Sequence, residues 1–245
     1  MFVMSQGLGD TIQGFSPVAN LLRSDPALNH VQFIIPQAYD RTCLHHFFTL
    51  NLIIRRPLRK VTGNSKRVMP AWFDVYSFEL PLGIPSPGDE DEDGMLHTIA
   101  SIDALLTKLV ESGVDPSRIV LGGLSQGAAI SLLTGLTIAK KLAGLFVLSG
   151  RLPLRNKLKT MVSPHASSIP VFWAHGKADP LVKYQLGRVS ADFLMTEIGL
   201  PAASFPGAPE GLDFHTYETL AHSVCEDELS DLGSWLAKIL PPLDV

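Results

Sequence analysis

The sequence is poor in cysteine, has no excess of positive charge and contains no long apolar run. Its two cysteines, Cys43 and Cys225, cannot form a disulfide framework, and no CxxC pair suggests a metal site. The formal net charge of −4 offers no basic surface of the kind that nucleic-acid binding requires. We therefore expect a protein of a reducing, intracellular compartment that has no nucleic acid as a partner.

Two further absences narrow the class of protein. No apolar run reaches the roughly 18 residues that a membrane-spanning helix needs. The N-terminus lacks a basic segment followed by a long apolar one, so no signal peptide is predicted. The chain is nevertheless 46% hydrophobic and only 18% charged, which is typical of a folded protein with a large core. We expect a soluble, cytoplasmic protein, and the composition allows transient contact with a membrane surface.

Short apolar runs alternate with longer helical patterns along the chain. We expect strands at residues 2–4, 31–35, 119–121, 145–148, 171–174 and 212–217. We expect helices at residues 94–112, 126–140, 183–199 and 225–240. This alternation predicts one α/β domain over residues 1–245, with a mostly parallel central sheet and helices on both faces. Functional groups should lie at the carboxyl ends of the strands.

Two segments do not follow this pattern. Residues 88–94, GDEDEDG, are acidic, and we interpret them as a solvated loop whose carboxylates favour the start of the next helix. Residues 39–60 are apolar and basic without a clear period, and we interpret them as an atypical insertion.

The pentapeptide Gly123-Leu124-Ser125-Gln126-Gly127 has the G-x-S-x-G pattern of a nucleophile elbow. An apolar run precedes it and helix-forming residues follow, so Ser125 should lie on a turn between a strand and a helix. The glycines leave room where the two backbones crowd, and the Gln126 N–H should face an oxyanion. The local pattern alone leaves open that Ser125 is only a helix N-cap.

A serine nucleophile needs a base, and eight histidines are available. In this architecture an acid and then a histidine should follow the serine, each after a later strand. Asp179 lies in the loop after residues 171–174, and His222 lies in the loop after residues 212–217. His215 falls inside a strand, and His175 is interpreted as structural. His45 and His46 lack further ligands at useful spacing, so we expect no metal.

The second oxyanion donor should come from a loop after an early strand. Gly7-Leu8-Gly9 follows residues 2–4, and the backbone N–H of Leu8 is the candidate donor. An ordinary turn is the open alternative. A phosphate-binding loop is not, because no lysine follows at the required spacing.

These motifs together resemble the acyl-protein thioesterase and lysophospholipase family of α/β-hydrolases, and its fungal members in particular. The segments that carry the resemblance keep the family's order and are GLGDT, MPAWFDV, DPSRIVLGGLSQGAAISLL, LAGLFVLSG, PVFWAHGKADPLV and AHSVCEDELSDLGSWL. The resemblance implies hydrolysis of fatty-acyl thioesters on protein cysteines, and also of lysophospholipid esters. It implies a catalytic triad of Ser125, Asp179 and His222.

The resemblance also implies further features of the site. Oxyanion donors would be the N–H groups of Leu8 and Gln126, and no cofactor would be required. The acyl chain would lie in an apolar groove, for which the nearest residues are Trp72, Leu80, Leu82 and Ile84. Family members act in the cytoplasm and nucleus, and a weak homodimer is allowed.

Several positions depart from the family pattern. Gln6 replaces a histidine in the first loop, Arg151 replaces a tryptophan, and Ala221 replaces a glycine. The first strand begins almost at Met1, which predicts that an edge strand of the family fold is missing. Together with residues 39–60, this suggests an imperfect gene model with a retained intron. A transcript that covers codons 36–64 continuously would exclude that intron.

Two other functions stay open. A small-molecule carboxylesterase would use the same triad, and would act on short acyl esters but not on palmitoyl thioesters. A non-catalytic acyl-binding or scaffold protein is the alternative that the departures suggest. Such a protein would not react with a fluorophosphonate at Ser125.

Overall fold

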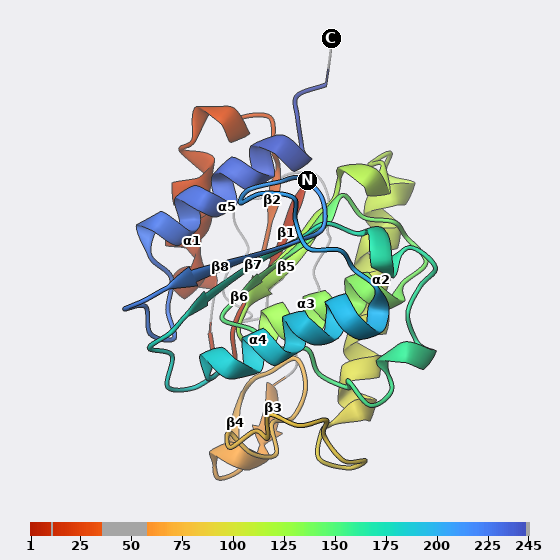
Figure 1. The fold of residues 1–245 in the computed structure, drawn as a ribbon, viewed down its shortest axis with the longest axis vertical. Coiled ribbons are helices and arrows are strands. Elements are labelled where there is room, and N and C mark those ends of the chain that lie inside the picture. Colours follow the sequence, from red (N-terminus) through yellow and green to blue (C-terminus); the bar gives the residue numbers. More distant parts are fainter. Residues whose placement is uncertain (11, 36–57, 244–245) are drawn as a thin grey trace.

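The computed structural model of the protein describes residues 1–10, 12–35 and 58–243, and its main feature is a parallel sheet (Figure 1). Six strands pair in the order β2-β1-β5-β6-β7-β8, and every pairing is parallel. They are β1 (Phe2–Ser5), β2 (Phe33–Ile34), β5 (Val120–Leu124), β6 (Gly144–Leu148), β7 (Val171–Gly176) and β8 (Leu212–Tyr217). The predicted α/β class with a mostly parallel sheet is confirmed.

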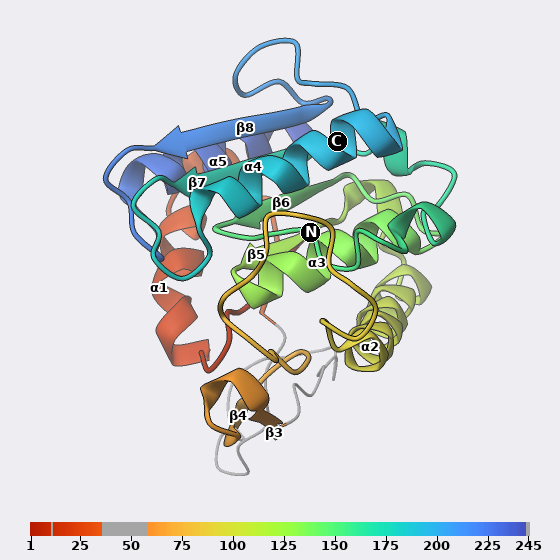
Figure 2. The ribbon, with the colours of Figure 1, turned by 60° about the horizontal axis from the view of Figure 1, so that its bottom comes forward.

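Helices cover both faces of this sheet (Figures 1 and 2). One face carries α1 (Ile12–Arg23) and α5 (Glu226–Ile239), and the other carries α2 (Glu92–Glu111), α3 (Gln126–Thr137) and α4 (Tyr184–Phe193). Side chains alternate between the two cores, as expected when strands are buried on both faces. Phe146 of β6 packs in the same cluster as Trp235 of α5, whereas its neighbour Val147 packs with α3 residues such as Leu132.

The expected strands and helices are present with small shifts at their ends, but one helix and two strands were not predicted. Helix α1 contains Pro17, which interrupts its helical pattern. A separate antiparallel hairpin is formed by β3 (Leu58–Val61) and β4 (Arg67–Pro70). The atypical segment 39–60 lies outside the described residues except for its last three, which begin β3. The single domain and the missing edge strand stay predictions.

The first turn of α5 buries a carboxyl group. The side chain of Glu228 has no exposed surface. Its pKa is raised to about 8, mainly by burial; the backbone N–H of Cys225 acts in the opposite direction, and the nearby charge of Asp231 adds to the rise. Because Cys225 is the N-cap residue of α5, this carboxyl lies just after the loop that carries His222. Glu228 is therefore held in its neutral form at neutral pH.

This burial predicts a pH-dependent loss of stability. The folded protein keeps a proton on Glu228 that the unfolded chain releases above its ordinary pKa of 4.5, so stability falls as the pH rises from 4.5 to about 8. Glu228→Gln removes this effect. Its free energy of unfolding should exceed that of the wild type by on the order of 4 kcal/mol at pH 8, with little difference at pH 4.

Urea unfolding at the two pH values measures this difference. Glu226→Gln is the matched control, because Glu226 lies in the same helical turn and is exposed. A gain for Glu228→Gln that is equal at both pH values would contradict the explanation.

Candidate active site

Ser125 occupies a strained turn between β5 and α3, with φ of 55° and ψ of −117°. A positive φ for a residue with a Cβ atom costs about 1–3 kcal/mol and persists only where the surroundings impose it. The backbone N–H of Ser125 donates to the carbonyl of Leu148 at the end of β6, at 2.9 Å. The Ser125 side chain makes no capping hydrogen bond to α3 and is half-buried. The turn has the geometry of a nucleophile elbow, and nothing in it favours a helix-cap role.

Two glycines allow another loop to approach this turn closely. A Cβ atom on Gly123 or on Gly127 would lie 2.1 Å from the carbonyl oxygen of Ser5. On Gly127 it would also lie 2.5 Å from the carbonyl oxygen of Gln6. Such contacts are too short for any side chain. The G-x-S-x-G spacing therefore brings the loop after β1 against the elbow.

Asp179 and His222 meet at the same edge of the sheet. Asp179 lies in the loop after β7, and His222 lies in the loop between β8 and α5; the arrowhead of β8 marks this edge in Figure 2. The Nδ1 atom of His222 is 2.7 Å from Oδ2 of Asp179. Because a carboxylate accepts the hydrogen bond, Nδ1 carries the proton and Nε2 is left to act as a base. The Asp179 side chain is fully buried, and that of His222 is 15% exposed.

The environment keeps Asp179 ionised despite its burial. Burial alone would raise the pKa of this carboxyl, but contacts with the imidazoles of His175 and His222 outweigh it and hold the pKa well below its usual range. The backbone N–H groups of Leu181 and Val182 donate to Oδ1 at 2.8 and 2.9 Å. A carboxylate with this many donors stays negative and can stabilise an imidazolium.

The predicted nucleophile, acid and base thus follow β5, β7 and β8 at the carboxyl edge of one sheet. The structure brings Asp179 and His222 into contact and places Ser125 two strands away from β7. His215, which sequence reasoning set aside, lies within β8 and pairs with Asp213 at 2.7 Å. The triad assignment itself stays a prediction.

The loop that carries Leu8 is fixed by the segment after β4. The indole N–H of Trp72 donates to the carbonyl of Gln6 at 2.9 Å, and the backbone N–H of Gly9 donates to Pro70 at 3.0 Å. The Gln126 side chain accepts from the backbone N–H of Trp72 at 2.9 Å. The loop that carries Leu8 and the side chain of Gln126 are therefore joined through Trp72. Trp72 is 1% exposed, and its indole N–H donates to this loop.

The other predicted acyl-binding residues lie on the segment that precedes α2. Leu80 is half-buried, while Leu82 and Ile84 are 49% and 58% exposed. The guanidinium of Arg155, itself buried, donates to the carbonyls of Leu82 and Gly83 at 3.1 and 2.5 Å. The buried guanidinium of Arg155 thus holds the backbone that carries these apolar side chains.

A second side-chain contact fastens this segment, and sequence reasoning missed it. Glu90 accepts from Arg151 at 2.5 Å through one oxygen, and from the backbone N–H of Leu154 at 2.9 Å through the other. Its side chain is only 5% exposed, so the acidic loop 88–94 is not wholly solvated as expected. The unusual Arg151 was the one signal in the sequence that pointed to this contact.

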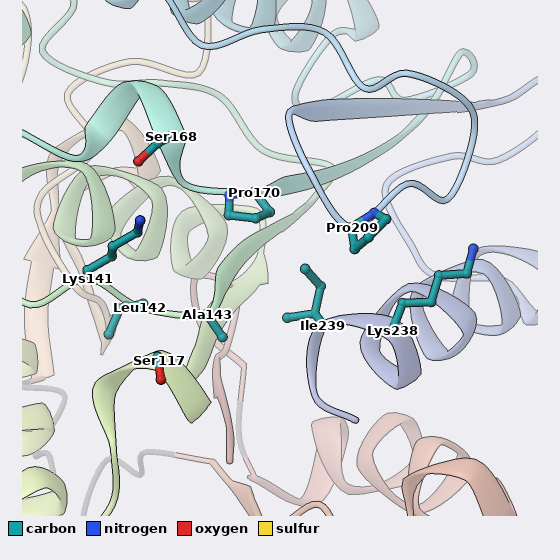
Figure 3. A pocket seen from close by; sticks show the side chains of 9 residues that line it. All are labelled: Ser117, Lys141, Leu142, Ala143, Ser168, Pro170, Pro209, Lys238 and Ile239. Atoms are coloured by element: carbon teal, nitrogen blue, oxygen red, sulfur yellow. The ribbon is translucent and has the colours of Figure 1, made fainter. Parts of the chain in front are cut away.

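A cavity of about 350 Å³ lies at the opposite end of the sheet, near the amino ends of β6 and β7 (Figure 3). Its lining includes Ala143, Pro170 and Lys238, and none of the predicted site residues. Ligands of parallel sheets bind at the carboxyl ends of the strands, so we do not assign this cavity to the site. In the described part of the chain, no group of three His, Cys, Asp or Glu residues is arranged to hold a metal.

Comparison with known proteins decides the family. A model of the phospholipase/carboxylesterase family matches residues 42–240. The chain belongs to this family. It is 39% identical over 240 residues to acyl-protein thioesterase 1 of Cryptococcus neoformans var. neoformans, covering 97% of this chain and 91% of the relative. The resemblance inferred from the motifs is confirmed.

Solved structures support the same membership of the phospholipase/carboxylesterase family. SOBER1 of Arabidopsis thaliana is similar with a TM-score of 0.78 and 27% identity, covering 98% of each chain. Acyl-protein thioesterase 2 of Zea mays is similar with a TM-score of 0.70 and 26% identity, covering 98% of this chain and 93% of that one. The α/β-hydrolase fold is thereby confirmed, and the chain is an enzyme of the esterase and thioesterase class.

The buried contact between Asp179 and His222 predicts the effect of removing one charge. Asp179→Asn keeps the size of the side chain but places the wrong tautomer on His222. We expect kcat for a short activated ester to fall by roughly 10⁴-fold with KM little changed. Steady-state kinetics measure both constants.

Asp213→Asn is the matched control, because Asp213 pairs with His215 on β8 in the same way. Its kcat should stay near that of the wild type. An Asp179→Asn enzyme with wild-type kcat would show that Asp179 does not support the base.

Proposed function

We propose that this protein hydrolyses fatty-acyl thioesters on protein cysteines, with Ser125 as the nucleophile, His222 as the base and Asp179 as the residue that orients it. The observation that carries the proposal is the 2.7 Å contact between Asp179 and His222 at the sheet edge where Ser125 occupies its strained turn. The similarity to relatives named acyl-protein thioesterase supports this substrate over other esters.

The first half of the reaction is acyl transfer to the enzyme. His222 Nε2 takes the proton from Ser125 while the serine oxygen attacks the acyl carbonyl carbon. The oxyanion of the tetrahedral intermediate accepts from the backbone N–H groups of Leu8 and Gln126. When the intermediate collapses, the C–S bond breaks, and the cysteine sulfur leaves as a thiol with the proton that His222 returns. Ser125 then holds the acyl group as an ester.

The second half repeats these steps with water. His222 removes a proton from the water, whose oxygen attacks the acyl carbonyl, and the fatty acid leaves as Ser125 recovers its proton. Because a cysteine thiol has a pKa near 8.5, its thiolate leaves more readily than an amine would. The thiolate therefore needs little help from the general acid in order to leave. Apart from the substrate, each step uses only groups of this chain and water.

The substrate's acyl chain needs an apolar surface near the serine. Leu80, Leu82 and Ile84 lie on the segment that Arg155 and Glu90 fasten to the loop after β6. That loop begins next to the elbow, since Ser125 donates to Leu148 at the end of β6. We propose that these side chains receive the acyl chain, with Trp72 bracing the oxyanion loop.

The family description favours a second substrate class as well. Lysophospholipid esters carry the same long acyl chain and would use the same triad, so they remain within the proposal. No helix among the described residues is long and apolar enough to cross a membrane. We propose that an acylated protein or lipid is met at the membrane surface. Location in the cytoplasm or nucleus and a weak homodimer stay predictions.

Ser125→Ala tests the chemistry directly. Turnover of an S-palmitoylated peptide should fall by roughly 10⁶-fold, the loss that follows removal of the nucleophile from a comparable triad. The matched control is Ser117→Ala, an exposed serine near the amino ends of the strands. Equal rates for Ser125→Ala and wild type would defeat the serine mechanism.

The wild-type enzyme separates the competing functions. Activity on acetyl esters with none on the palmitoylated peptide would indicate a small-molecule carboxylesterase. No turnover of either substrate, with no fluorophosphonate adduct on Ser125 of the folded protein, would indicate a non-catalytic acyl-binding protein.

A further inference from the structure

A second histidine lies against the carboxylate of Asp179. His175 is the penultimate residue of β7, four residues before Asp179, and its side chain has no exposed surface. Its Nε2 atom is 3.5 Å from Oδ2 of Asp179, the same oxygen that accepts from His222 at 2.7 Å. Two imidazoles therefore approach one buried carboxylate oxygen from different elements.

The surroundings of His175 determine its tautomer. Its Nε2 is 2.8 Å from the carbonyl oxygen of Val182, which can only accept a hydrogen bond, so Nε2 carries the proton. The other ring nitrogen, Nδ1, is buried and has no hydrogen-bond partner among the described residues. Protonation there would bury an uncompensated N–H group, which is unfavourable. His175 thus carries a proton on Nε2, which donates to Val182 and lies next to Asp179.

Helix α4 prevents the ring from leaving this orientation. A Cβ atom on Gly187 of α4 would lie 2.4 Å from Nδ1 of His175, so the helix backbone packs directly on the ring. The ring of Tyr184 meets His175 edge-on, with centroids 6.0 Å apart. The imidazole is therefore confined between the helix and the acid's loop.

His175, Val182 and Asp179 contact one another around the carboxylate. Val182 donates its backbone N–H to Oδ1 of Asp179 at 2.9 Å, and its carbonyl accepts from His175. The same Nε2 atom of His175 lies 3.5 Å from Oδ2 of Asp179, the oxygen that accepts from His222. Loss of the His175 N–H would remove its hydrogen bond to Val182 and its contact with Asp179. The carboxylate could then rotate away from His222.

We propose that His175 is a positioning residue for the hydrolase reaction, which acts through Asp179 by fixing the carboxylate oxygen that holds the His222 tautomer. The proposal rests on the proposed triad. The low pKa of Asp179 agrees with it, because the contacts with the imidazoles of His175 and His222 both lower the pKa of this buried carboxyl. In a merely structural role, His175 would fill space between β7 and α4 and have no effect on the state of His222.

Two substitutions separate positioning from packing. In His175→Gln the side-chain amide can bring an N–H near the place of Nε2, whereas in His175→Asn it reaches only to the place of Nδ1. His215→Gln and His215→Asn are the matched controls on the neighbouring strand, since His215 pairs with Asp213 and not with Asp179. Hydrolysis of p-nitrophenyl acetate gives kcat and KM, and thermal unfolding shows which variants fold.

We expect His175→Asn to lower kcat by roughly 10- to 100-fold with KM unchanged, the range expected when one contact to a charged group is lost. His175→Gln should recover kcat to within a few fold, and both His215 variants should keep it. Wild-type kcat in His175→Asn, or an equal loss in His175→Asn and His175→Gln, would overturn the proposal. If the wild type itself does not hydrolyse the ester, the proposed function fails instead.

The wild-type protein supplies a second test that needs no variant. Nitrogen-15 NMR of the imidazoles at alkaline pH should show His175 protonated at Nε2 and His222 protonated at Nδ1. The downfield proton resonance of His222 Nδ1 should persist in His175→Gln. A wild-type His175 protonated at Nδ1 would overturn the proposal, even if His175→Asn does not fold.

Discussion

The close approach of two backbone segments is the constraint on which the site depends. The carbonyl of Ser5 lies where a Cβ atom of Gly123 or Gly127 would have to be, so the loop after β1 and the elbow after β5 can only meet through glycine. Since β1 and β5 are neighbours in the sheet, this contact is fixed by strand pairing and not by flexible side chains. The strain at Ser125 is maintained because the surrounding sheet leaves the turn no room to relax.

Much of the fold, and the contact between Asp179 and His222, could be predicted from the sequence because both depend on local patterns. Residues 212–217 have the bounds of β8, since a short segment in which apolar and polar residues alternate is typical of a strand. The hairpin β3–β4 was missed because its strands are short and rich in Arg and Lys. Helix α1 was missed because Pro17 interrupts its period.

Contacts between distant residues left little trace in the sequence. Glu90 and Arg151 are 61 residues apart, and the acidic run that contains Glu90 resembles any solvated loop. Trp72 could have been a ligand contact or a brace, because an apolar residue with one polar N–H fits both. Only the hydrogen bond from the Trp72 indole to the Gln6 carbonyl shows that Trp72 braces the loop. From the sequence, His175 was interpreted as structural. No local pattern shows that Val182 and Asp179 fold back to contact its side chain.

The predicted triad with the loop after β1, and the apolar segment with Leu82 and Ile84, are therefore held by different kinds of interaction. Backbone donors, glycine contacts and buried imidazoles fix the serine, the acid and the oxyanion loop. The segment with Leu82 and Ile84 is instead held by the side chains of Arg155 and Glu90. Backbone contacts persist when surface side chains change, whereas a single substitution at Arg155 or Glu90 can release the segment with Leu82 and Ile84. If this segment receives the acyl chain as proposed, changes in it would alter which acyl groups are accepted without moving Ser125, Asp179 or His222.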